Sequence, residues 1–321
     1  MDIMKQRWEQ TDKELAKLLK KIKKTSRTTR DNIQSIFNGI KYTYQELFTY
    51  ASLNELDRFN RIIQDREIDG YTAYKIKRIA NKKRVKRSEI IEAMIIMEFY
   101  DDLQKKNKDI METLETEVTI TYEQALKECG GRVRPRLNAT FLSVLLLTPV
   151  YRGYLWKDYI DGLISYNAST IYRQMLINLQ QERELDVDDD VFDKLFTKMD
   201  NSLLHRKEIG YEDLPVYLDK YSGSVDALST YVVNKTVLQA YINYGIKEVL
   251  FVAEYDNKTT DMCKTLDGQT FKIDEMNYYN RYSSADGRIV KYTTEGLVVG
   301  DNLPPINNHF HWCRSTIIAK K

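Results

Sequence analysis

The fold is decided where the sequence changes period, in VDALSTYVVNKTVLQAYINYGIKEVLFVA, residues 225–253. Val233, Val237 and their apolar neighbours recur at the spacing of a helix, so residues 225–244 are predicted to be helical. Gly245 then supplies the left-handed conformation that commonly ends a helix. The apolar run at 249–253 has no helical spacing and ends in polar residues, which predicts a mostly buried strand.

Short strands and turns are expected to follow this first strand. Asp267-Gly268 is a turn signal, because both residue types tolerate the backbone angles that tight turns need. Further strands are expected at residues 269–273, 288–292, 297–299 and 315–319. Such short segments joined by turns predict a small antiparallel sheet at the C-terminal end of the sequence.

The rest of the chain is expected to be helical. Only 13 Gly and 5 Pro occur among 321 residues, so helices have few interior breakers. Helical spacing recurs over residues 5–115 and 137–220. Thr121 and Gln124 have the spacing of a capping box, which predicts a new short helix that Gly130 ends. The predicted class is α+β and mostly helical, with a helical N-terminal region 1–130, a helical middle region 131–224 and a C-terminal domain 225–321.

Composition points to a protein kept in a reducing compartment and without a membrane anchor. Hydrophobic residues make up 42% and charged residues 30%, with a net charge of +2. The 3 Cys are too few and odd in number for a secreted disulfide scaffold. The longest apolar run, 141–147, is far shorter than the roughly 20 residues needed to span a bilayer.

An ordered set of residues carries the most specific pattern. A Cys precedes Leu-Asp-Gly, and the chain later closes on Pro-Pro, His and Cys-Arg. The positions are Asp256, Cys263, Asp267, Gly268, Pro304, Pro305, His311, Cys313 and Arg314. Their order and spacing resemble the C-terminal domain of phage minor head proteins, the head-morphogenesis family related to the F protein of phage Mu. Many relatives have Cys-x-x-Cys before Leu-Asp-Gly and a closing Cys-Arg-Cys, whereas this chain has Thr260 and Ser315 at those places.

The resemblance implies a minor capsid protein without enzymatic activity. It implies a place in the capsid interior at the portal vertex, after assembly in the host cytoplasm. The implied role is procapsid and head assembly, with DNA packaging or ejection as a further role. The implied partners are the portal protein, a major capsid or scaffolding protein and packaged double-stranded DNA. The motif residues are expected to be structural, with partner binding in the upstream helices.

The Cys and His residues admit other chemistry. Cys263, His309, His311 and Cys313 are ligand types that zinc prefers. Single Cys residues instead of Cys-x-x-Cys pairs favour the alternative, in which no cofactor is bound and the thiols are small buried apolar groups. A Cys–His pair would make a toxin-like hydrolase, but no oxyanion loop is recognisable.

A basic cluster suggests a second function. Eight cations crowd one stretch: Lys75, Lys77, Arg78, Lys82, Lys83, Arg84, Lys86 and Arg87. They could neutralise DNA phosphates without reading base sequence, as in a non-specific DNA-binding internal virion protein. The alternatives are a solvated helix face paired with Asp and Glu, or a surface that meets an acidic patch on a partner protein.

Overall fold

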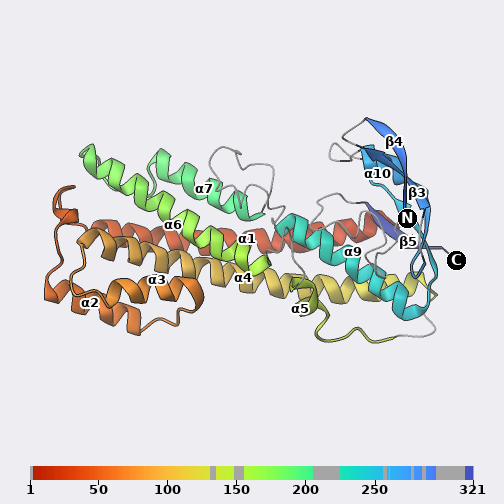
Figure 1. Ribbon diagram of the computed structural model, residues 1–321, viewed down its shortest axis with the longest axis horizontal. Helices are drawn as coiled ribbons and strands as arrows, with labels where there is room; N and C mark the ends of the chain where they lie inside the picture. Colours follow the sequence, from red (N-terminus) through yellow and green to blue (C-terminus); the bar gives the residue numbers. More distant parts are fainter. Residues whose placement is uncertain are drawn as a thin grey trace.

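Two long antiparallel helices form the axis of the molecule. In this computed structural model, the residues described are 3–130, 135–147, 155–204, 225–255, 259, 261–275, 278–283, 287–293 and 315–320. Helix α1 (Ile3–Asn38) packs along α4 (Arg87–Glu128), with which it makes its most extensive contact. At about 1.5 Å per residue, the 42 residues of α4 span about 63 Å, which explains the elongated shape in Figure 1.

Shorter helices flank this pair at one end. The turn η1 (Glu46–Phe48) leads to α2 (Leu53–Gln64) and α3 (Gly70–Ala80). These two helices lie on one side of the α1–α4 pair, and α6 (Trp156–Gln180) and α7 (Asp190–Leu204) lie on the other (Figure 1). The short α5 (Phe141–Leu146) contacts α4. Helix α9 (Val225–Tyr244) packs over the C-terminal half of α4.

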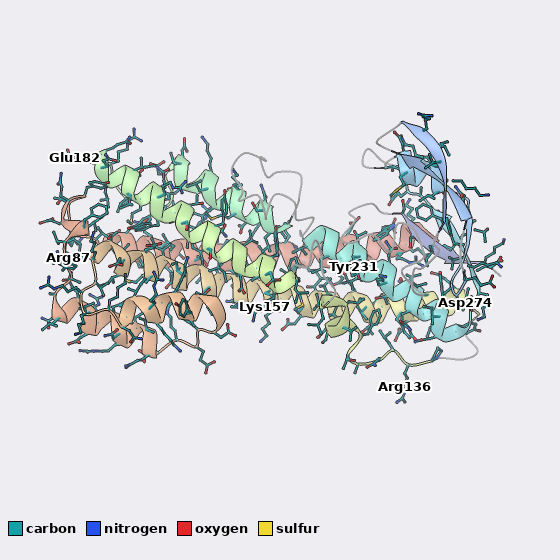
Figure 2. All side chains as sticks on the ribbon, viewed as in Figure 1. Arg87, Arg136, Lys157, Glu182, Tyr231 and Asp274 are labelled. Atoms are coloured by element: carbon teal, nitrogen blue, oxygen red, sulfur yellow. The ribbon has the colours of Figure 1, made fainter. Side chains whose placement is uncertain are left out.

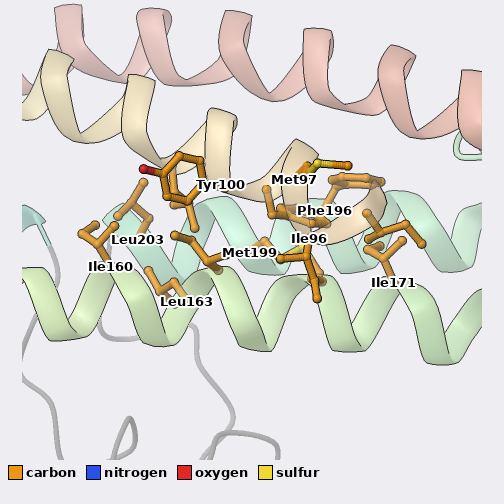
Figure 3. Packing of buried hydrophobic residues seen from close by; sticks show 14 of the residues in the cluster. Ile96, Met97, Tyr100, Ile160, Leu163, Ile171, Phe196, Met199 and Leu203 are labelled. Atoms are coloured by element: carbon orange, nitrogen blue, oxygen red, sulfur yellow. The ribbon is translucent and has the colours of Figure 1, made fainter. Parts of the chain in front are cut away.

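The main core runs along α4 between the flanking helices, and Figure 3 shows the part of it where α4, α6 and α7 meet. On α6, Ile160, Ile164 and Ile171 recur at helical spacing and are at most 2% exposed. Phe99 of α4 stacks on Phe196 of α7, with ring centroids 6.1 Å apart. An apolar stripe of this kind must be buried against other helices, so the sequence period directly produces the bundle.

A three-stranded antiparallel sheet forms the other end. The strand order is β2 (Thr270–Lys272), β1 (Glu248–Val252), β5 (Thr316–Ala319). Helix α10 (Asp261–Leu266) connects β1 to β2, and a separate hairpin pairs β3 (Tyr278–Ser283) with β4 (Arg288–Thr293). Phe251 of β1 lies opposite Ile317 of β5, and both are fully buried.

The second core lies beneath this sheet. It joins Val249 and Phe271 of the strands to Tyr241 of α9 and to Ala125 near the end of α4. Helices α4 and α9 therefore contribute side chains to both cores. The sheet is thus built directly onto the last turns of the long helical body.

The predicted fold class is confirmed: the molecule is mostly helical, with a small antiparallel sheet at the C-terminal end. Helix α9 has the predicted bounds, and strands form at the first, second and terminal predicted positions and at 288–293. The strand predicted at 297–299 lies outside the described residues.

One prediction was wrong. The capping-box residues Thr121 and Gln124 do not begin a helix, because α4 continues through them to Glu128. Tyr122, Ala125 and Leu126 are buried in the second core along this stretch. Burial of such side chains is worth more than the roughly 1 kcal/mol of a cap, so packing extends the helix.

A buried arginine ties the two ends of the chain together. Arg7 of α1 is 2% exposed and donates to both oxygens of Glu128 at 2.9 and 3.1 Å. It also donates to the Thr316 hydroxyl at 2.7 Å and to the Ile317 carbonyl at 3.3 Å. The Tyr241 hydroxyl donates to Glu128 at 2.5 Å. One network therefore joins α1, α4, α9 and β5.

A second buried network joins the helices farther along the axis. Lys106 of α4 lies 2.8 Å from Asp102 and 2.9 Å from Asp200 of α7. Thr29 and Ser26 of α1 donate to the same two carboxylates at 2.7 and 2.6 Å. Burial alone would lower the pKa of Lys106, but the two carboxylates raise it. These bonds specify which faces of α1, α4 and α7 meet.

Glu117 of α4 is a buried acid between the two networks. It is 2% exposed, and it accepts a 2.7 Å hydrogen bond from Ser229 of α9. Its other oxygen has no hydrogen-bond partner among the described residues. Burial, together with the carboxylates of Glu14 and Asp12 on α1, raises its pKa to about 8, although the Ser229 bond opposes this. Glu117 is therefore mostly protonated at neutral pH.

We expect Arg7→Ala to lower the free energy of unfolding by about 3–5 kcal/mol, because it leaves the Glu128 carboxylate without its cation. Urea denaturation measures the change. Lys5→Ala is the matched control, since Lys5 pairs only with exposed Glu9 on the same helix. A loss no larger than that of the control would contradict the role given to Arg7.

We expect Glu117→Gln to be more stable than the wild type at pH 8 and similar to it near pH 4.5. The folded pKa lies above the ordinary 4.5. The stability contributed by the protonated carboxyl is therefore complete below about pH 4.5 and lost as the pH rises to about 8. The difference at pH 8, measured by urea denaturation across this range, should be a few kcal/mol. Exposed Glu115→Gln is the control and should show no such trend.

Candidate functional site

The predicted motif residues fall partly within the described structure. Cys263, Asp267 and Gly268 are described. The others lie outside the described residues: Asp256, Pro304, Pro305, His309, His311, Cys313 and Arg314. The described motif residues therefore lie on α10 and in the turn between α10 and β2.

Asp267 and Gly268 hold the end of β1 against this turn. The Ala253 amide donates to one Asp267 oxygen at 2.9 Å, and the Tyr255 hydroxyl donates to the other at 3.0 Å. Gly268 has φ of +76°, and its amide donates to the Phe251 carbonyl at 3.0 Å. Both carboxylate oxygens therefore accept hydrogen bonds from the protein itself, one from a backbone amide and one from a tyrosine hydroxyl. This arrangement is typical of a structural turn.

Cys263 is a buried thiol on α10. It is 0% exposed and belongs to the core that contains Leu266, Phe251 and Phe271. Its environment is that of a small apolar side chain. The described part of the chain holds no group of three or more His, Cys, Asp or Glu side chains arranged for a metal. Of the four residues expected as zinc ligands, Cys263 lies among the described residues and the other three lie outside them.

The basic cluster is at the opposite end of the molecule from the sheet. Arg87, the first residue of α4, marks this end in Figure 2, and Asp274 beside β2 marks the other. Lys75, Lys77 and Arg78 lie on α3, Arg87 begins α4, and the other four cations lie in the connection between these helices. The eight cations therefore lie on consecutive elements at one end, and their surroundings differ.

Several of these cations are occupied within the molecule. Lys82 forms an ion pair with Glu89, and the Arg84 guanidinium lies 5.4 Å from the centroid of the Tyr50 ring. Arg87 pairs with Glu55 at 2.8 Å. Lys77, Arg78 and Lys83 are exposed and form no ion pair with any described residue. The alternative of a solvated helix face paired with Asp and Glu thus holds for part of the cluster. Lys77, Arg78 and Lys83 are available to bind a partner.

The segment at residues 40–87 carries surplus positive charge, whereas residues 182–190, which begin at the same end, hold six Asp and Glu against one Arg. Residues 40–87 contain twelve Lys and Arg against six Asp and Glu, a net charge of +6 in a chain whose total is +2. Large apolar side chains are also exposed here: Phe48, Tyr50, Leu53 and Tyr74, at 40%, 54%, 79% and 61%. Exposed apolar groups beside surplus charge of one sign are typical of a surface that meets a partner.

Sequence reasoning missed the apolar part of this surface. Phe48 lies in η1, and Tyr50 forms an isolated bridge with Lys86 instead of joining a helix. One sequence signal could have shown that these residues lie outside a helix. The spacing of Phe48, Tyr50 and Leu53 breaks the helical period of the segments on either side.

Among the described residues, no helix is both long and apolar enough to cross a membrane. Comparison with models of known families, with curated proteins and with solved structures gave no match in any of the three.

We expect Asp267→Ala to destabilise the sheet by about 1–3 kcal/mol, because it leaves the Ala253 amide without its acceptor. Hydrogen exchange of that amide, combined with urea denaturation, measures the effect. Asp261→Ala is the control, since Asp261 lies on the same connection and, among the described residues, its ion pair is with exposed Lys264. Equal exchange rates in both variants would contradict the structural role of Asp267.

Proposed function

We propose that this chain is a phage minor head protein that binds near the portal and acts in procapsid and head assembly. A role in DNA packaging or ejection is part of the same proposal, because the protein would lie in the capsid interior at the portal vertex. It would be a structural component rather than an enzyme, and its partners would be the portal protein and a major capsid or scaffolding protein. Assembly would take place in the host cytoplasm.

One observation supports this proposal most. The described residues of the motif, Cys263, Asp267 and Gly268, serve packing and turn geometry, which suits a structural module. At the far end, exposed cations lie beside the exposed side chains of Phe48, Tyr50, Leu53 and Tyr74, although Tyr255 and Ile289 are also exposed near the sheet. This division favours a protein whose sheet, built onto the ends of α4 and α9, is structural and whose opposite end makes the contacts with partners.

The second candidate is a non-specific DNA-binding protein of the virion interior. The exposed cations Lys77, Arg78 and Lys83, without ion pairs among the described residues, favour it. It ranks second because Lys82 and Arg87 are already paired with carboxylates in the protein. Charge that is neutralised internally adds little to phosphate binding.

Co-expression with the portal and major capsid proteins of the encoding genome tests the proposal. We expect this protein to co-purify with the portal at moderate salt and to be present in procapsids. Deleting its gene should reduce the yield of complete heads. Absence from procapsids, together with normal heads after deletion, would overturn the proposal. Binding to duplex DNA that weakens steeply with salt, without portal binding, would put the second candidate first.

A further inference from the structure

A pocket opens at the basic end, between three helices. It is lined by the C-terminal turn of α1, by α2 and by the first turns of α4. Its apolar walls are formed by Ile36, Ile40, Phe59, Ile62, Ile91 and Met94. Phe59 is 1% exposed, and Ile36 and Ile91 are 9% and 7% exposed, so the walls are held in place by the main core.

The volume of the pocket sets the size of its occupant. It measures about 170 Å³. An engineered protein cavity of about 150 Å³ holds one benzene molecule, so this pocket accepts one large apolar side chain. An extended acyl chain would need a much longer channel.

The mouth of the pocket is polar and already organised. Arg87 donates to Glu55 at 2.8 Å, and its guanidinium lies 4.5 Å from the centroid of the Tyr42 ring. Tyr42 also hydrogen-bonds to Glu55. The Arg87 hydrogen bond lowers the pKa of Glu55 to about 2, so this carboxylate stays charged and paired. The Glu55–Arg87 pair is therefore neutral as a unit.

Arg58 leaves an uncompensated positive charge at the same mouth. It lines the pocket from α2, is exposed, and forms no ion pair with the residues that the structure describes. Among the residues that line the pocket, Arg58 and Arg87 stand against Glu55, a net charge of +1. An occupant with nearby carboxylates would gain from this field, whereas a basic one would be repelled.

We propose that this pocket binds one Leu, Met or Phe side chain of an acidic segment of a partner protein, with an adjacent Asp or Glu pairing with Arg58. The inference rests on the proposed function, because the partner would be a head component docked on the helical body. The pocket supplies the apolar anchor site, and the charge at its mouth selects the flanking residues.

Selection from a displayed library of random linear peptides, with the full-length protein as bait, tests this inference. The enriched peptides should share one large apolar residue next to Asp or Glu. Their affinity is then measured by fluorescence anisotropy against two variants. Ser35→Phe places a ring into the pocket from an exposed position on α1, and Arg58→Glu reverses the charge at the mouth. Each should weaken binding about tenfold or more, or about 1.4 kcal/mol.

Two controls are matched to these variants. Ser35→Ala changes the same position without filling the pocket. Arg61→Glu makes the same charge change on an exposed residue of α2 that does not line the pocket. Both should keep the affinity within about twofold. Circular dichroism and the thermal midpoint establish that all four variants are folded.

The inference is overturned if no peptides with an acidic and apolar consensus are enriched, or if Ser35→Phe binds them as well as the wild type. Self-association of the protein that Ser35→Phe abolishes would also overturn it, because the occupant would then be a second copy. Portal co-purification that is unchanged by Ser35→Phe and Arg58→Glu would reject the pocket while the proposed function stands. Loss of peptide binding in both variants, without any portal binding, would reject the proposed function while the pocket stands.

Discussion

The pairing of Arg7 with Glu128 is the interaction on which the rest of the structure depends. It joins the first turns of α1 to the last turns of α4 and so sets the register of two antiparallel helices. The same guanidinium donates to Thr316 and Ile317 of β5, so the terminal strand is positioned by the beginning of the chain. A buried guanidinium needs a paired carboxylate and hydrogen bonds, and Arg7 makes these through its two terminal nitrogens, while its Nε has no partner among the described residues.

The two ends of the molecule differ because their polar groups are used differently. At the sheet, Asp267 gives both carboxylate oxygens to groups of its own chain, and Cys263 is enclosed by apolar side chains. At the other end, Arg58 forms no ion pair with the described residues, and Leu53 is largely exposed. At the sheet these motif groups are satisfied within the chain, whereas the helical end has exposed cations and apolar side chains to offer a partner.

Local patterns could predict only what local interactions control. The period change at Gly245 located α9 and β1, and the Asp267-Gly268 signal located the turn before β2. Helix α10 was missed, because six residues are too few to show a helical period. The helix start predicted at Thr121 was wrong for a different reason. The local capping pattern is present, but burial of Tyr122 and Leu126 extends α4 through it. Arg58 and Arg87 were not recognised as neighbours at one pocket, because no local pattern relates residues on separate helices.

The sequence by itself determined that the protein is mostly helical, that a small sheet follows residue 245 and that one stretch is strongly basic. These properties depend on the spacing of apolar residues and on composition, which act over a few turns. The tertiary structure alone decided which cations are available and which are paired, that Glu117 is buried beside Ser229, and that a pocket lies beside Arg58. The burial of Glu117 and the pocket depend on contacts between helices far apart in the chain, namely α4 with α9 and α1 with α2 and α4, which no local pattern describes.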